Sequence, residues 1–114
     1  MDIGVEYLRQ EVVRLALHGR VDSASAHAFA QRMEHVIASG CRRLAIDFGD
    51  VRYITSAGFR ALLVADAKMN ELSGQLALCC LPHDVQRLFD IGAFNDDFVI
   101  VPTLEECVVR LLQR

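Results

Sequence analysis

A helix needs about 18 consecutive apolar residues to cross a bilayer, and the apolar runs of this chain are far shorter. Its first residues also do not combine a charged start with an apolar stretch, which is the pattern of a secretory signal. We therefore expect a cytoplasmic protein that is not inserted in a membrane.

Clusters of positive charge are equally scarce. Lys68 is the only lysine, and Arg42-Arg43 is the only adjacent pair of basic residues, in a chain whose net charge is −3. Proteins that bind nucleic acid present clustered lysine and arginine to the phosphates. This composition predicts no direct binding to nucleic acid.

Motifs that carry catalysis or hold cofactors are also missing. The chain has no G-x-S-x-G nucleophile motif and no glycine-rich phosphate loop. Its cysteines lack the C-x-x-C spacing of zinc and redox sites, and its histidines show no ligand or triad pattern. The four cysteines are Cys41, Cys79, Cys80 and Cys107, and the four histidines are His18, His27, His35 and His83. We predict buried free thiols and a protein that is not an enzyme, with no metal or cofactor of its own.

The length of 114 residues fits one domain over residues 1–114 and leaves no room for a second. Hydrophobic residues make up 53% of the chain, which is high for a soluble protein. Such a content suggests a core together with an apolar patch kept for a partner. The composition therefore favours a protein interaction module.

Strand and helix periodicities alternate along the chain. Residues 5–8 and 11–18 alternate as two strands of a hairpin, joined at Arg9-Gln10. Further strands are expected at 44–48, 75–81 and 98–101, and helices from Asp22 or Ser23 to Gly40, over 56–72 with Gly74 as its cap, over 82–91, and from a capping box at Thr103. This order predicts an α/β fold, a mixed β-sheet with four helices packed on it.

The segment from Leu44 to Leu63 is the most informative part of the chain. We expect Gly49-Asp50 to break the strand that ends at residue 48, and residues 51–54 are again strand formers. Helical spacing begins at Ser56, where free N–H groups and the helix dipole tolerate a phosphate. Ser56 is therefore a candidate phosphorylation site. The alternatives are a hydroxyl that only caps the helix, and Thr55 as the acceptor.

This segment resembles the signature of the STAS domain, the fold of bacterial anti-sigma factor antagonists. The matching residues are Asp47-Phe48, Val51, Tyr53-Ile54, Ser56, Gly58, Phe59 and Leu62-Leu63. Thr55 stands where the family has an aspartate before the phosphorylated serine, and Ala57 stands in place of a second serine. Weaker similarity over 18–22 and 82–92 extends the resemblance to nearly the whole chain.

The resemblance implies an anti-sigma factor antagonist. Its unphosphorylated form would bind an anti-sigma factor serine kinase and release the sigma factor, and phosphorylation at Ser56 would switch it off. The kinase would use ATP, and a PP2C-type phosphatase would restore the serine. A homodimer is left open. Two alternatives use the same fold, namely a STAS subunit that docks on a membrane transporter ATPase in phospholipid trafficking and a stressosome-like scaffold.

The expected partner-binding residues surround the switch serine: Asp22, Asp47, Asp50, Thr55, Ser56, Ala57, Gly58 and Phe59. Several have a structural alternative. Asp22 can cap the helix that follows it, and Asp47 and Asp50 can order the loop below the switch instead of forming a negative rim. Glycine in a first helical turn costs stability, so a side chain at Gly58 would obstruct either a partner or the internal packing.

Overall fold

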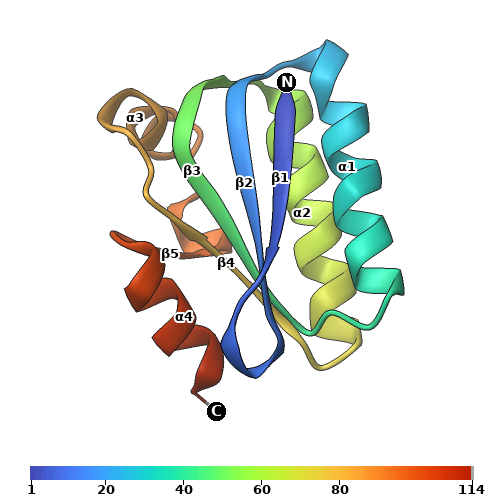
Figure 1. Ribbon diagram of the computed structural model, residues 1–114. Coiled ribbons are helices and arrows are strands. Elements are labelled where there is room, and N and C mark those ends of the chain that lie inside the picture. The colour runs from blue at the N-terminus through green and yellow to red at the C-terminus, as the bar shows by residue number, and fades with distance from the viewer. Residues whose placement is uncertain (114) are drawn as a thin grey trace.

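A single β-sheet organises residues 1–113, the part of the chain that this computed structural model describes (Figure 1). Its five strands lie in the order β1-β2-β3-β4-β5. The first two strands run antiparallel, and all later neighbours are parallel. The strands are β1 (Asp2–Tyr7), β2 (Val12–Val21), β3 (Arg43–Ile54), β4 (Gln75–Cys79) and β5 (Val99–Val101). The predicted mixed sheet is confirmed.

Helices cover both faces of this sheet. The helices α1 (Ser23–Ala38) and α2 (Ser56–Glu71) lie side by side on one face, and α3 (His83–Ile91) joins the core on that side (Figure 1). The helix α4 (Leu104–Leu112) packs on the opposite face against β3 and β4. The chain therefore has the predicted α/β fold. Within residues 1–113, none of the helices is both long and apolar enough to cross a membrane.

Strand β3 is longer than its sequence pattern predicts. The expected break at Gly49-Asp50 is wrong, because the strand continues to Ile54. Its parallel neighbour β2 also continues, so that His18 pairs with Asp50 and Val21 pairs with Ile54. The register between β2 and β3 shifts twice along this stretch, and the two strands pair again after each shift. As a result, α1 and α2 begin at the same level of the sheet.

Two other strand boundaries differ from the pattern. The first strand occupies Asp2–Tyr7 instead of 5–8, because its partner β2 offers a backbone ladder along that whole length. The fourth strand ends at Cys79, short of the expected residue 81, because Cys80 has a φ of 63°, a left-handed conformation that no strand continues.

The core has two parts, one on each face of the sheet. The larger lies under α1, α2 and α3 and contains the fully buried side chains Phe29, Phe48, Leu62, Met69 and Phe89. The smaller lies under α4 and consists of Val12, Ala45, Ala77, Cys79, Cys107, Val108 and Leu111. The prediction of buried free thiols holds for Cys41, Cys79 and Cys107, whereas Cys80 is only half-buried.

Candidate functional site

Ser56 is the first residue of α2, and its side chain is exposed. The N-cap position belongs to Thr55, whose side chain makes no capping hydrogen bond. Instead the Thr55 backbone N–H and its hydroxyl both donate to the carbonyl of Val21, at 2.9 and 3.3 Å. The idea that Ser56 is the helix cap is therefore wrong. The first N–H groups of α2 have no side-chain acceptor at its N-cap, so they remain available to an anion.

Gly58 is buried two residues further along the same turn. A Cβ atom there would lie 2.7 Å from Cγ1 of Ile54 and 2.8 Å from Cγ1 of Val21. Both neighbours are core residues at the ends of β3 and β2. Of the two predicted explanations, internal packing accounts for this glycine, and the expected direct contact between Gly58 and a partner is wrong.

Phe59 is also a core residue and not a surface contact, since its side chain is buried. Its ring stacks on Phe94 with 4.3 Å between centroids and meets the edge of Phe89 at 4.8 Å. Phe89 belongs to α3, and Phe94 follows that helix. The prediction that Phe59 binds a partner is therefore wrong. Phe59 instead packs the first turn of α2 against α3 and the residues that follow it, and so holds the turn that carries Ser56 in place.

Asp47 does not contribute to a negative rim, because it is 8% exposed and both of its carboxylate oxygens accept hydrogen bonds. One carboxylate oxygen accepts a hydrogen bond from the Gly49 N–H at 2.8 Å, as the structural alternative predicted. The other accepts two from the Arg14 guanidinium, at 2.7 and 3.0 Å. Arg14 also pairs with Glu6, and the bond to Asp47 is the largest cause that raises the pKa of Arg14. Arg14 was not among the predicted site residues, although a charged residue on the face of β2 opposite Val13 and Leu15 indicates a buried partner of opposite charge.

Asp22 lies at the start of α1, where it forms a reciprocal capping box. Its carboxylate accepts from the N–H groups of Ala24 and Ser25, at 3.1 and 3.0 Å, and the Ser25 hydroxyl accepts from the N–H of Asp22. The backbone and side-chain bonds from Ser25 lower the pKa of Asp22. The predicted capping role is thereby confirmed.

The surface beside Ser56 is formed by residues in the last parts of β2 and β3. Asp50 is exposed and lies 2.9 Å from Nδ1 of His18 on β2. One step further along, the Arg20 guanidinium stacks over the exposed ring of Tyr53 at 4.7 Å. Sequence reasoning missed this pair, which only the parallel register of β2 and β3 brings together. Charged groups and one aromatic ring thus border the start of α2.

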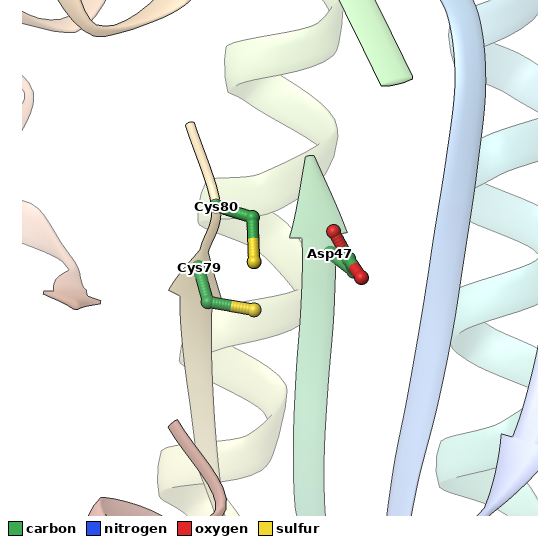
Figure 2. A group of neighbouring side chains, drawn as sticks. All are labelled: Asp47, Cys79 and Cys80. Carbon is green, nitrogen blue, oxygen red and sulfur yellow. The ribbon is translucent and has the colours of Figure 1, made fainter. Parts of the chain in front are cut away.

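A second group of side chains lies where the carboxyl end of β4 meets the middle of β3, and there Cys79 and Cys80 lie close to Asp47 (Figure 2). Burial raises the pKa of the Cys80 thiol to about 12. A hydrogen bond with Cys107, together with burial, raises the pKa of Cys79. Both thiols are therefore protonated and weakly nucleophilic at neutral pH. The sequence does not connect these cysteines with Asp47, because two adjacent cysteines do not match the spacing of a metal or redox motif.

The STAS domain pattern matches residues 7–107 of this chain. Among curated proteins, the chain is 33% identical over 89 residues to BtrV of Bordetella bronchiseptica, which is named as an anti-sigma factor antagonist. That similarity covers 78% of this chain and 77% of BtrV. The family match and the alignment with BtrV thus each cover most of the segment from β2 to α4.

Solved structures show the same fold at low sequence identity. A Thermotoga maritima protein named as an anti-sigma factor antagonist is 17% identical, with a TM-score of 0.90 over 97% of this chain and 95% of that one. Phosphorylated SpoIIAA of Bacillus is also 17% identical, with a TM-score of 0.72 over 96% of this chain and 98% of SpoIIAA.

Proposed function

We propose, from the premise that this chain belongs to the STAS domain family, that its unphosphorylated form binds an anti-sigma factor serine kinase and thereby frees a sigma factor. The similarity to BtrV supports the role of anti-sigma factor antagonist. The observation that carries the switch is the exposed hydroxyl of Ser56 at the uncapped start of α2. Phosphorylation there reverses the binding.

The physical basis of the switch is a change of charge without a change of fold. A phosphoserine adds about −1.5 to −2 charges at neutral pH. The free N–H groups and dipole at the start of α2 stabilise a phosphate within the protein. A partner surface that fits a neutral hydroxyl must instead desolvate the new charge, which weakens the complex. SpoIIAA, which shares the fold, is known in a phosphorylated form.

Ser56 is a better acceptor than its neighbour Thr55. The Thr55 hydroxyl is half-buried and donates to the Val21 carbonyl. Phosphorylation of Thr55 would therefore have to break that hydrogen bond and expose the side chain, whereas Ser56 is exposed already. The replacement of the family's aspartate by Thr55 then alters how the kinase recognises the site without moving the acceptor.

The proposed contact surface differs from the one that the sequence predicts. It loses the buried residues Asp47, Gly58 and Phe59 and gains exposed residues of β2 and β3. It keeps Thr55, Ser56 and Ala57, together with Asp22 and Asp50. The exposed pair Arg20 and Tyr53 extends it, because aromatic and arginine side chains are enriched at the centres of interfaces. Kinase-bound ATP supplies the phosphoryl group, and a PP2C-type phosphatase returns the protein to its binding form.

The test is incubation with ATP and the candidate kinase, followed by mapping of the phosphate by mass spectrometry. We expect stoichiometric labelling of the wild type and of Thr55→Val, and none of Ser56→Ala. Thr55→Val is the matched control because it removes the neighbouring hydroxyl while keeping a branched side chain. Undiminished labelling of Ser56→Ala would contradict the proposal, as would unchanged kinase affinity after complete phosphorylation.

A further inference from the structure

The backbone at the end of β4 brings two adjacent cysteines to the same side of the chain. Successive side chains of a strand normally point to opposite faces. Cys80 follows the last residue of β4 with a φ of 63°, a conformation that residues other than glycine seldom adopt. The sulfur atoms of Cys79 and Cys80 consequently lie near each other on the side of β4 that faces Asp47 on β3 (Figure 2). Strained backbone of this kind is concentrated at functional sites.

We propose that Asp47, Cys79 and Cys80 form a binding site for a divalent thiophilic cation, with zinc as the representative ion. Their two sulfur atoms and a carboxylate oxygen all lie within 4.8 Å of one another. Ligand atoms in a tetrahedral zinc site are separated by roughly 3.3 to 3.8 Å, so small side-chain rotations bring these three into place. Water completes the fourth position. Magnesium and calcium are disfavoured because they require oxygen ligands.

The carboxylate is held in place by hydrogen bonds of its own. Gly49 donates to one oxygen of Asp47 and Arg14 donates twice to the other. The oxygen that accepts only from Gly49 keeps a lone pair for a metal ion, whereas both lone pairs of the other oxygen are occupied by Arg14. Such second contacts orient a ligand and tune its affinity. One divalent ion offsets two of the three negative charges of two thiolates and a carboxylate, and Arg14, which is shared by Asp47 and Glu6, offsets part of the third. The two thiol protons leave to solvent when the ion binds.

The location also fits a ligand site. Strand β4 ends here, while β3 continues to Ile54, and α/β sheets bind ligands beyond the carboxyl ends of parallel strands. Cys79 is buried under α4, while the half-buried Cys80 gives the ion an entry path. The site lies before the last part of β3 and shares no residue with the start of α2. It therefore stands independently of the proposed phosphorylation switch.

The experiment uses fully reduced protein in a buffer without thiols, with cobalt(II) as the spectroscopic probe and zinc as the competitor. We expect one ion per chain, a thiolate-to-cobalt charge-transfer band, and loss of that band when zinc is added. Cys80→Ser should weaken binding by roughly tenfold or more. Cys41→Ser is the matched control, because Cys41 is another buried free thiol that lies outside the cluster. Its affinity should equal that of the wild type.

Two results would overturn the site: a wild type without the charge-transfer band, or a Cys80→Ser variant that binds as tightly as the wild type. If Cys80→Ser does not fold, X-ray absorption at the zinc edge of the wild-type complex decides the matter. Two sulfur neighbours per zinc support the site, and a shell of only nitrogen and oxygen refutes it. Zinc should also raise the melting temperature of the wild type, because an ion that binds only the folded state stabilises it.

Discussion

Helices α1 and α2 begin beside each other at the ends of paired strands, yet their first turns are built in opposite ways. Asp22 closes the start of α1 with a reciprocal capping box. Thr55 occupies the same position before α2, but its hydroxyl donates back to Val21 and caps nothing. A side-chain cap stabilises a helix, so the first turn of α1 contributes to the stability of the fold. The first turn of α2 lacks that contribution, and its N–H groups stay open to an anion.

The α2 turn itself divides between an exposed and a buried side. Ser56 is exposed, whereas Gly58 and Phe59 are packed into the core. The exposed residue can therefore change chemically while its neighbours hold the backbone still. A switch at this place does not require the helix to move.

The largest effect should come from filling the buried side of the α2 turn. Gly58→Leu forces a side chain against Ile54 and Val21, where even a Cβ atom is too close. We expect a loss of about 1–3 kcal/mol in the free energy of unfolding, the usual cost of overpacking, measured by urea denaturation. Ser56→Ala in the same turn is the control and should change that free energy by less than about 0.5 kcal/mol. A Gly58→Leu protein of wild-type stability would show that the turn is not packed as described.

A smaller loss should follow from opening the capped helix. Asp22→Ala removes the acceptor for two N–H groups of α1 and should lower the urea midpoint, whereas Thr55→Val before α2 should lower it less. The pKa of Asp22 lies below its ordinary value of 3.8 because of Ser25, so its stabilisation is present above that value and is lost as the pH falls through the lower, folded-state pKa. The free energy of unfolding of Asp22→Ala should therefore decrease less on acidification than that of the wild type. Equal midpoints for both variants would erase the contrast between the two helix starts.

The smallest effect should be a gain at the open helix. Ser56→Asp places a carboxylate at the first position of α2, where the dipole and free N–H groups favour it by about 0.3–1 kcal/mol. The unfolding free energy should rise by that amount at low salt, and calorimetry should show weaker binding to the anti-sigma factor serine kinase. A Ser56→Asp protein that is destabilised would indicate that the N–H groups of α2 are already satisfied.

The sequence was sufficient for the order of elements because each has a clear period of two or of 3.6 residues. The pattern cannot decide how far a ladder extends, which is why the break at Gly49-Asp50 was wrong: the length of β3 depends on pairing with β2. The bond between Arg14 and Asp47 was missed for the same reason, since it joins residues of two strands whose register periodicity does not fix.

The candidate site was predictable at Ser56, where local cues and the family signature agree. Proximity to Ser56 in the sequence suggests a partner contact for Phe59 and leaves two explanations for Gly58, but both residues are buried. The space around Gly58 is set by side chains of two strands, which one sequence does not reveal. Likewise, the convergence of Cys79 and Cys80 depends on one left-handed backbone angle that no residue pattern signals for a cysteine.

The strand order has a consequence for how the chain assembles in time. Each strand lies beside the strand that precedes it in the sequence, so each can pair as soon as it is synthesised. Contacts between segments close in sequence form fastest. The helix α4 departs from this rule, because it reaches back past β4 to β3. The layer under α4 must therefore complete last, and a ribosome-bound chain that stops before Leu104 leaves Ala45 and Ala77 open to solvent.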